Sequence, residues 1–376
     1  MKRKSTFTTR RGENVGPTDE KEETEMRHFY KLASVIAVLF IWAGAAQGDP
    51  DTFSIDRDSE AAIAKDLLPP DILTPGPTIN VPLESLGLSW DEDLGTGDDL
   101  NALSAGLDSF ARPPVFFFSV DRDSVGIDGN PQTPIVSDVF EEAASGQAAG
   151  DVFVTIYGHP GVPIWSAPVG QNMLHINQSE LGLFPAILQT QDYTGQDIID
   201  DLDALNFTEF DMDGNGSPDV NVYFSLDSLS TSLGTLGATA DDILLFAPGA
   251  ASAVIFADGD NDIGLQEGDD LDALVLLDLG TRGEIDQFGD RAFFSLAPGS
   301  PTLVANGYSP ADIFYTNFNG TYVREFTAAQ LGLLATDDVD ALEAEPGAYV
   351  PEPQTLFLVG TGALLLIGVI RRKRMK

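Results

Sequence analysis

Four short motifs recur in the same order four times along this chain of 376 residues, and this recurrence restricts the possible folds more than any other feature. Each unit opens with Phe-Ser and an apolar residue, continues with Asp and two apolar residues, and then has an apolar-Gly-Leu triplet. Each unit closes on a segment close to Asp-Asp-Leu-Asp-Ala-Leu. Such recurrence indicates internal structural repeats that pack against their neighbours. The closing segments are residues 98–103, 200–205, 269–274 and 337–342.

The four units differ in length. From Phe-Ser to Asp-Asp they span 45, 82, 45 and 43 residues, so the second unit carries an insertion. We place the units at about residues 53–103, 118–205, 224–274 and 294–342. The Asp that precedes two apolar residues is Asp71, Asp151, Asp242 and Asp312, and the triplets centre on Gly87, Gly182, Gly264 and Gly332.

Within a unit, the apolar runs are short and are bounded by Gly, Pro, Asp and Asn. Residues 220–226, 243–246 and 253–256 are examples, and they are typical of β-strands. No long helical period is present, although the closing segment could begin a short helix with Asp as its cap. Three or four strands in each of four units predict a mainly β fold, a small four-bladed β-propeller. One β-sandwich, or two in tandem, is the alternative.

The position of the repeats in the chain also suggests how a ring closes. The first unit begins with a Phe-Ser element, and the last ends with an Asp-Ala-Leu element. We therefore expect the last Asp-Ala-Leu strand to pair with the first unit. The recurrence of Asp-Ala resembles the repeats of hemopexin-type four-bladed propellers. The disulfide that closes the ring in that family is impossible here, because the chain has no cysteine.

The charge of the chain is strongly negative. It has 59 Asp and Glu against 20 Lys and Arg, a formal net charge of -39. Such a chain repels nucleic acids and anionic lipid head groups and attracts cations. A hydrophobic content of 43% argues against wholesale disorder. Without cysteine, disulfides, thiolate metal sites and a cysteine nucleophile are excluded.

The N-terminal region is typical of a secretory signal peptide. Residues 26–31 are partly basic, residues 32–42 are apolar, and residues 43–48 are small. We expect a signal peptide at residues 26–48, read by the Sec machinery, with cleavage after Gly48 or Ala45. We interpret residues 1–25 as an overextended start. A retained membrane anchor is the alternative, although the apolar run is short for a bilayer of about 30 Å.

The C-terminal region is the most specific signal in the chain. A Pro-Glu-Pro triplet precedes an apolar stretch at residues 355–370, and a basic cluster follows, as the positive-inside bias requires. These three parts resemble the PEP-CTERM sorting domain, and the resemblance covers residues 350–376. The residues that carry it are Pro351, Glu352, Pro353, Arg371, Arg372, Lys373 and Arg374.

That resemblance implies recognition by an exosortase, a membrane-embedded transpeptidase-like enzyme, in a Gram-negative bacterium. Processing near the triplet would follow, with delivery to the cell surface or an exopolysaccharide matrix. Before processing, the C-terminal helix would hold the chain in the membrane. The alternative is an ordinary membrane anchor with a chance Pro-Glu-Pro triplet.

Two acidic segments are candidate calcium loops, because they place hard oxygen ligands at alternate positions. The stronger lacks the glutamate at the twelfth position of an EF-hand, and the alternative for both is a solvated turn. The predicted ligands are Asp211, Asp213, Asn215, Ser217 and Asp219 in the first segment, and Asp258, Asp260 and Asp262 in the second. Asp121–Asp123 and Asp128–Asn130 are weaker candidates. The Asp-Asp pairs that close each repeat could ring a channel and bind a cation. We favour the interpretation that their side chains act as caps and accept hydrogen bonds in turns.

Catalysis has little support in the sequence. His159 and His175 stand in no metal-ligand spacing, and no nucleophile signature accompanies them. Trp90 and Trp165 could stack on sugars, but burial is the better interpretation. We expect a non-enzymatic surface or matrix protein with a calcium-binding body and exopolysaccharide or surface proteins as partners. A secreted enzyme that cleaves glycans with Asp or Glu is the alternative.

Overall fold

A computed structural model describes the repeat region of the chain. All of the described residues belong to one compact unit, Gly48–Gly347. They are residues 52–57, 59–61, 67–69, 71–91, 96–104, 115–127, 137–156, 172–183, 200–207, 221–278, 281–287 and 289–343.

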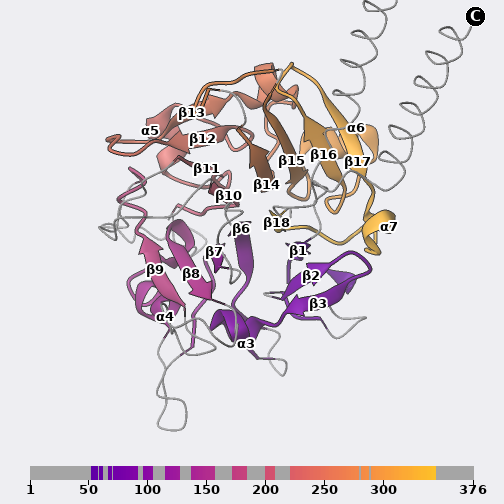
Figure 1. Cartoon of the computed structure of the whole chain (residues 1–376). Coiled ribbons are helices and arrows are strands. Elements are labelled where there is room, and N and C mark those ends of the chain that lie inside the picture. Colours follow the sequence, from indigo (N-terminus) through magenta and orange to yellow (C-terminus); the bar gives the residue numbers. More distant parts are fainter. Residues whose placement is uncertain are drawn as a thin grey trace, which may run out of the picture. The chain divides into compact units, whose positions relative to one another are not determined.

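Four antiparallel sheets of four strands each form the blades of a β-propeller (Figure 1). Blade 1 consists of β18 (Ala341–Glu343), β1 (Thr52–Ser54), β2 (Ile72–Thr74) and β3 (Thr78–Val81). Blade 2 consists of β6 (Leu100–Ser104), β7 (Val115–Val120), β8 (Val152–Ile156) and β9 (Met173–Ile176). Blade 3 consists of β10 (Ala204–Phe207), β11 (Val222–Ser225), β12 (Ile243–Phe246) and β13 (Val254–Ala257). Blade 4 consists of β14 (Leu271–Leu277), β15 (Arg291–Leu296), β16 (Ile313–Thr316) and β17 (Tyr322–Phe326). The prediction of a mainly β, four-bladed propeller is confirmed.

Short elements connect these strands. A two-stranded ribbon pairs β4 (Trp90–Asp91) with β5 (Thr96–Gly97). Among the described residues, the α-helices are α3 (Leu83–Leu86), α4 (Asp138–Ala143), α5 (Ser232–Leu236), α6 (Pro301–Asn306) and α7 (Ala328–Leu331). The same residues include a 3-10 turn, η1 (Ala148–Gly150), and a π-helical turn, η2 (Gly259–Ile263).

The Asp-Ala-Leu segments become the innermost strands. β6, β10, β14 and β18 contact one another, and Figure 1 shows them nearest the centre. Each sequence repeat therefore supplies the three outer strands of one blade and the innermost strand of the next. The short helix that the closing segment could begin does not form, because the last residues of this segment pair as a strand in all four blades.

The ring closes by pairing the end of the chain with its beginning, as the sequence predicts. β18 is antiparallel to β1, with Phe53 opposite Leu342 and Ser54 opposite Ala341. A serine from the first unit adds to this closure, because Ser59 Oγ accepts a hydrogen bond from the Asp338 N–H at 2.9 Å. Residues far apart in sequence thus complete one blade.

Apolar side chains on both faces of each blade form the core. The Phe of each Phe-Ser motif is buried against the preceding blade. In blades 2 to 4 the residue before it, Phe117, Tyr223 or Phe293, faces the following blade. This arrangement explains why the strands are apolar runs instead of strict alternations: both faces of a blade are covered. One apolar cluster fills each of the four interfaces between adjacent blades.

The glycine of each apolar-Gly-Leu triplet ends a short turn or helix. Gly87, Gly182, Gly264 and Gly332 have φ values of 74°, 76°, 88° and 80°, a region that favours glycine. The N–H of the following leucine returns to a carbonyl near the start of the turn, as with Leu333 and Ala328 at 2.8 Å. The triplet is therefore a helix stop that turns the chain toward the next blade.

Closure through β18 predicts a large effect of one leucine. Leu342 is 1% exposed and packs in the core between blades 4 and 1. We expect Leu342→Ala to lower the free energy of unfolding by about 2–5 kcal/mol, because it removes apolar contacts and leaves a cavity. Urea unfolding of the full-length protein in detergent measures the change. Val323→Ala on β17, where Val323 is 54% exposed, is the control; equal losses in both variants would contradict closure by β18.

Candidate metal centre

The first aspartate of each Asp-Asp pair accepts backbone hydrogen bonds that connect it to neighbouring turns. Asp269 accepts hydrogen bonds from the Thr302 N–H in α6 at 2.7 Å and from the Gln266 N–H at 2.8 Å. Asp337 accepts in the same way from Ala61 and Leu334, at 2.9 and 2.6 Å. Asp98 and Asp200 also accept backbone N–H groups of the following unit. The interpretation as caps and turn acceptors fits this first aspartate.

A second set of aspartates makes equivalent contacts inside each blade. Asp71, Asp151, Asp242 and Asp312 accept the backbone N–H of the turn that follows the outer hairpin, at 2.7–2.9 Å. In blade 2 this contact is less complete, because Asp151 Oδ2 and both polar atoms of the Gln178 side chain are buried without hydrogen-bond partners. Burial, reinforced by Glu142 and Glu180, raises the pKa of Asp151 to about 8.

The remaining acids of the closing segments converge where the four innermost strands begin. They are the second aspartate of each pair and the acid or amide two residues later. Aspartates that follow the Phe-Ser-apolar motif join them. We call this set the axial cluster: Asp56, Asp99, Asn101, Asp121, Asp201, Asp203, Asp227, Asp270, Asp272, Asp338 and Asp340.

Three groups within the axial cluster bring carboxylate oxygens within 4.8 Å of one another. They are Asp56–Asp99–Asp340, Asp203–Asp227–Asp270 and Asp272–Asp338–Asp340. The third group is the most enclosed, with Asp272, Asp338 and Asp340 only 8%, 7% and 5% exposed. Carboxylates at such distances in a buried site repel one another unless protons or cations intervene.

Two arginines neutralise part of the axial cluster. Arg57 donates to Asp99 through its backbone N–H at 3.0 Å and through Nε at 3.2 Å, and its Nη2 contacts Asp121. Arg122 pairs through Nε with Asp201 at 3.4 Å and through Nη2 with Asp227. Both arginines follow an aspartate of the cluster directly in sequence.

An amide replaces one acid of the cluster. Asn101 Nδ2 donates to Asp201 Oδ1 and to Asp203 Oδ1, both at 3.1 Å. Because an amide carries no charge and supplies donors, Asn101 relieves repulsion between these two acids. Within the axial cluster, the partners of the two arginines and of the amide are therefore acids from the first three units of the sequence. These acids are Asp99, Asp121, Asp201, Asp203 and Asp227.

Burial dominates the titration of the acids that lack such partners. It raises the pKa values of Asp272 and Asp340 well above their usual range, and neighbouring carboxylates add to the shift. The neighbouring Asp338 side chain contributes to the raised pKa of Asp272, so a proton shared by these two carboxyl groups is one way to relieve their repulsion. The oxygens Asp270 Oδ1, Asp272 Oδ2 and Asp338 Oδ1 remain buried without a hydrogen-bond partner. Chemically, these acids of the axial cluster can hold either protons or a cation that prefers oxygen ligands.

The two predicted calcium loops have different outcomes. Asp211, Asp213, Asn215, Ser217 and Asp219 lie outside the described residues. In the second loop, Asp258 and Asp262 accept hydrogen bonds within η2, from Asn261 and Asp258 N–H groups at 2.9 and 3.0 Å, and Asp260 is exposed. Within the described part, no group of three close acids includes these residues. Both loops stay predictions.

The weaker candidates are placed differently again. Asp121 and Asp123 face Arg57, so a cation already lies beside them. Asp128, Asn130, His159 and Trp165 lie outside the described residues. His175 packs on the rings of Phe117 and Phe207, with centroids 4.9 and 6.0 Å away. Trp90 is partly buried against the core between blades 1 and 2.

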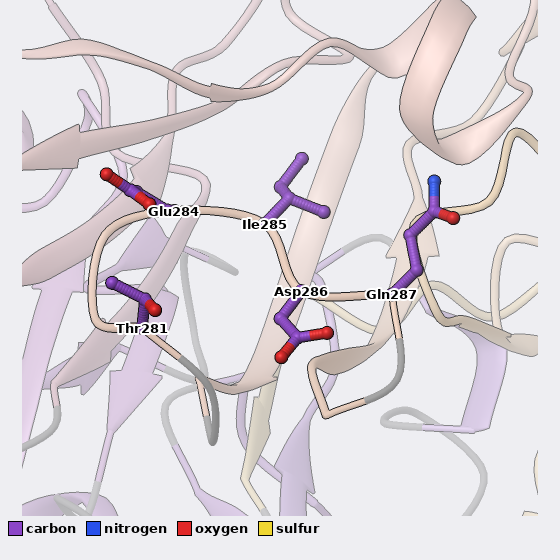
Figure 2. Close-up of a pocket in the computed structure, with 5 residues that line it drawn as sticks. All are labelled: Thr281, Glu284, Ile285, Asp286 and Gln287. Atoms are coloured by element: carbon purple, nitrogen blue, oxygen red, sulfur yellow. The ribbon is translucent and has the colours of Figure 1, made fainter.

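A surface pocket of about 360 Å³ lies on the loop between β14 and β15. Its lining residues are Thr281, Glu284, Ile285, Asp286 and Gln287. Figure 2 shows these side chains spread along one loop and pointing in different directions. Because they do not converge on a common point, the pocket offers no defined set of ligands.

Sequence reasoning missed the acids that matter most at the axis. The fourth position of the closing segment, occupied by Asn101, Asp203, Asp272 and Asp340, belongs to the repeated motif but was not among the predicted ligands. A second signal was the aspartate after Phe-Ser-apolar in three of the four units, at Asp56, Asp121 and Asp227. Comparing the four units position by position would have shown both.

Comparison with known protein families assigns the C-terminal region. The PEP-CTERM protein-sorting motif matches residues 350–374. The chain carries a PEP-CTERM sorting motif. This motif implies an exported protein that an exosortase sorts to the cell surface. No curated protein and no solved structure matches the chain, so the likeness to hemopexin-type repeats rests on motif and repeat number alone.

The PEP-CTERM motif itself lies outside the described residues. Among the helices that the structure describes, none has the length and apolar character needed to cross a bilayer. The structural account therefore concerns the propeller, and the sorting account concerns the motif.

The buried acid of blade 2 predicts a specific pH dependence. Since the pKa of Asp151 is raised in the folded protein, its folded form binds more protons than the unfolded chain between about pH 4 and pH 8. This contribution to stability is complete below pH 4 and is lost as the pH rises through about 8. Asp151→Asn keeps an acceptor for the Gln178 N–H but cannot ionise.

We therefore expect the difference in free energy of unfolding between Asp151→Asn and the wild type to move in favour of the variant from pH 5 to pH 9. Urea unfolding at both pH values measures it. Glu267→Gln, an exposed acid, is the control. A difference that does not change with pH would show that Asp151 is ionised in the folded protein.

Proposed function

We propose that the chain is an exosortase-sorted protein of the bacterial cell surface or extracellular matrix. Its acidic propeller would be a non-enzymatic binding or structural module that calcium stabilises. The PEP-CTERM motif supports the destination. The observation that carries the proposal for the body is the axial cluster, whose buried aspartates outnumber its two arginines and include oxygens without partners.

Calcium suits this cluster on chemical grounds. It binds six to eight oxygen ligands in flexible geometry, and carboxylates are its preferred protein ligands. A bound cation would convert repulsion among buried carboxylates into attraction, so that part of the folding free energy would come from binding. Extracellular calcium would then favour the folded module only after export.

The proposed lack of enzymatic activity rests on where the acids lie. A glycan-cleaving pair must reach a sugar from two sides, with carboxyl groups about 5–10 Å apart in an accessible cleft. The acids of the third axial group are at most 8% exposed. Asp98, Asp200, Asp269 and Asp337 accept backbone hydrogen bonds instead. A screen of the purified protein against polysaccharides tests this part of the proposal.

Removing calcium should destabilise the module. A ligand present at about a hundred times its dissociation constant stabilises a protein by about 2.7 kcal/mol. We expect EDTA to lower the melting temperature of the full-length protein in detergent by about 5 °C. Excess calcium should restore it, whereas potassium chloride at equal ionic strength should not. An unchanged midpoint in EDTA would reject a stabilising calcium site.

Sorting should depend on the Pro-Glu-Pro triplet. We expect Glu352→Ala to leave uncleaved protein in the membrane fraction of a host that has an exosortase, because the recognised triplet is altered. Gln354→Ala, just outside the triplet, is the matched control. Immunoblots of membrane, surface and medium fractions measure the distribution. Equal release of both variants would show that the triplet does not direct processing.

A further inference from the structure

The four repeats place equivalent residues at the axis, and the differences between them indicate where a cation binds. Each set combines an acid or amide from one closing segment, the residue after the next Phe-Ser-apolar motif, and the second aspartate of the next pair. The four sets are Asp340–Asp56–Asp99, Asn101–Asp121–Asp201, Asp203–Asp227–Asp270 and Asp272–Ala297–Asp338. The last set therefore lacks the middle acid.

The residue after the middle position determines whether a set has its own cation. It is Arg57 in the first set and Arg122 in the second, but Ser228 in the third and Pro298 in the fourth. Each arginine also reaches forward to the middle acid of the next set, Arg57 to Asp121 and Arg122 to Asp227. Arg57 and Arg122 thus form ion pairs with acids of the first three sets, and neither of them pairs with an acid of the fourth set in the described part of the chain.

The acids around the fourth set remain without a basic partner among the described residues. Asp272, Asp338 and Asp340 place oxygens within 4.8 Å of one another, and ion pairs with Lys or Arg are found at none of them in that part of the chain. Asp272 Oδ2 and Asp338 Oδ1 are buried and accept no hydrogen bond. These two oxygens are the unpartnered ligands that an oxygen-binding cation requires.

We propose that Asp272, Asp338 and Asp340 bind a divalent cation, with calcium as the best fit, and that Arg57 and Arg122 occupy the equivalent cation positions elsewhere at the axis. This inference rests on the proposed calcium-stabilised body and assigns its site. The geometry gives three buried carboxylates, each of which places one oxygen within 4.8 Å of the others. An ion would thus fill one cation position at the axis, and the guanidinium groups of Arg57 and Arg122 fill two others.

The first test removes the charge of the proposed ligands. Calcium binding to the full-length protein in detergent is measured by calorimetry, with the chelator-induced change in melting temperature as a second readout. Asp272→Asn combined with Asp338→Asn should remove one calcium per chain and abolish the response to EDTA. In EDTA this variant should melt no lower than the wild type, because it no longer buries repelling carboxylates.

The control for charge is Glu267→Gln combined with Glu284→Gln, which removes two exposed acids. It should bind calcium as the wild type does. A double variant that still binds the full amount of calcium, or that melts far lower than the wild type in EDTA, would overturn the assignment.

The second test concerns the arginines. Arg57→Met leaves Asp99 and Asp121 without their guanidinium, so it should bind one more calcium per chain than the wild type. An unchanged stoichiometry would overturn the idea that this side chain occupies a cation position.

A further comparison separates this inference from the proposed function. If the wild type binds calcium, and Asp211→Asn combined with Asp213→Asn removes all of it, the axial assignment fails and the calcium-stabilised body stands. If the wild type binds no calcium, both fail.

Discussion

The fold depends on keeping buried carboxylates together where four innermost strands meet. Closing a ring of four blades brings the starts of β6, β10, β14 and β18 into contact, and each start carries acids of the repeated motif. Repulsion in such a site opposes folding unless each negative charge is shared, protonated or neutralised. The chain uses backbone N–H groups for the first aspartate of each pair, and arginines or an amide for several of the others. The remaining excess points to a cation.

The repeated motif therefore performs two tasks with adjacent residues. The first aspartate joins one unit to the next through backbone hydrogen bonds, so it defines where each blade begins. The second and third acids face the axis, where each side chain meets partners from other blades. The units differ in the charge that they place at the axis. Asn101, Ala297, Arg57 and Arg122 all change the local charge there, whereas the joining aspartates are the same in all four units.

The sequence predicted the number of blades and the pairing of the last strand with the first unit, since both follow from local repetition. It could not predict which acids meet. Asp56 and Asp340 lie at opposite ends of the body and become neighbours only when the ring closes. The direction in which Arg57 and Arg122 extend is likewise set by packing, so the charge balance of each set was hidden. The Asp-Asp pairs were candidates for a cation site, but the sequence could not show that their two aspartates have different partners, the first in turns and the second at the axis.

Export and the proposed cation site would be linked, because a protein that its PEP-CTERM motif sorts to the cell surface would meet extracellular calcium there. The most direct measurement of the central claim is anomalous X-ray diffraction from crystals of the protein soaked in a terbium salt, since terbium substitutes for calcium. The account predicts an anomalous peak within about 2.3–2.6 Å of oxygens from Asp272, Asp338 and Asp340. A map with no peak there, and with oxygens of Asp272 and Asp338 at hydrogen-bonding distance from each other, would contradict it.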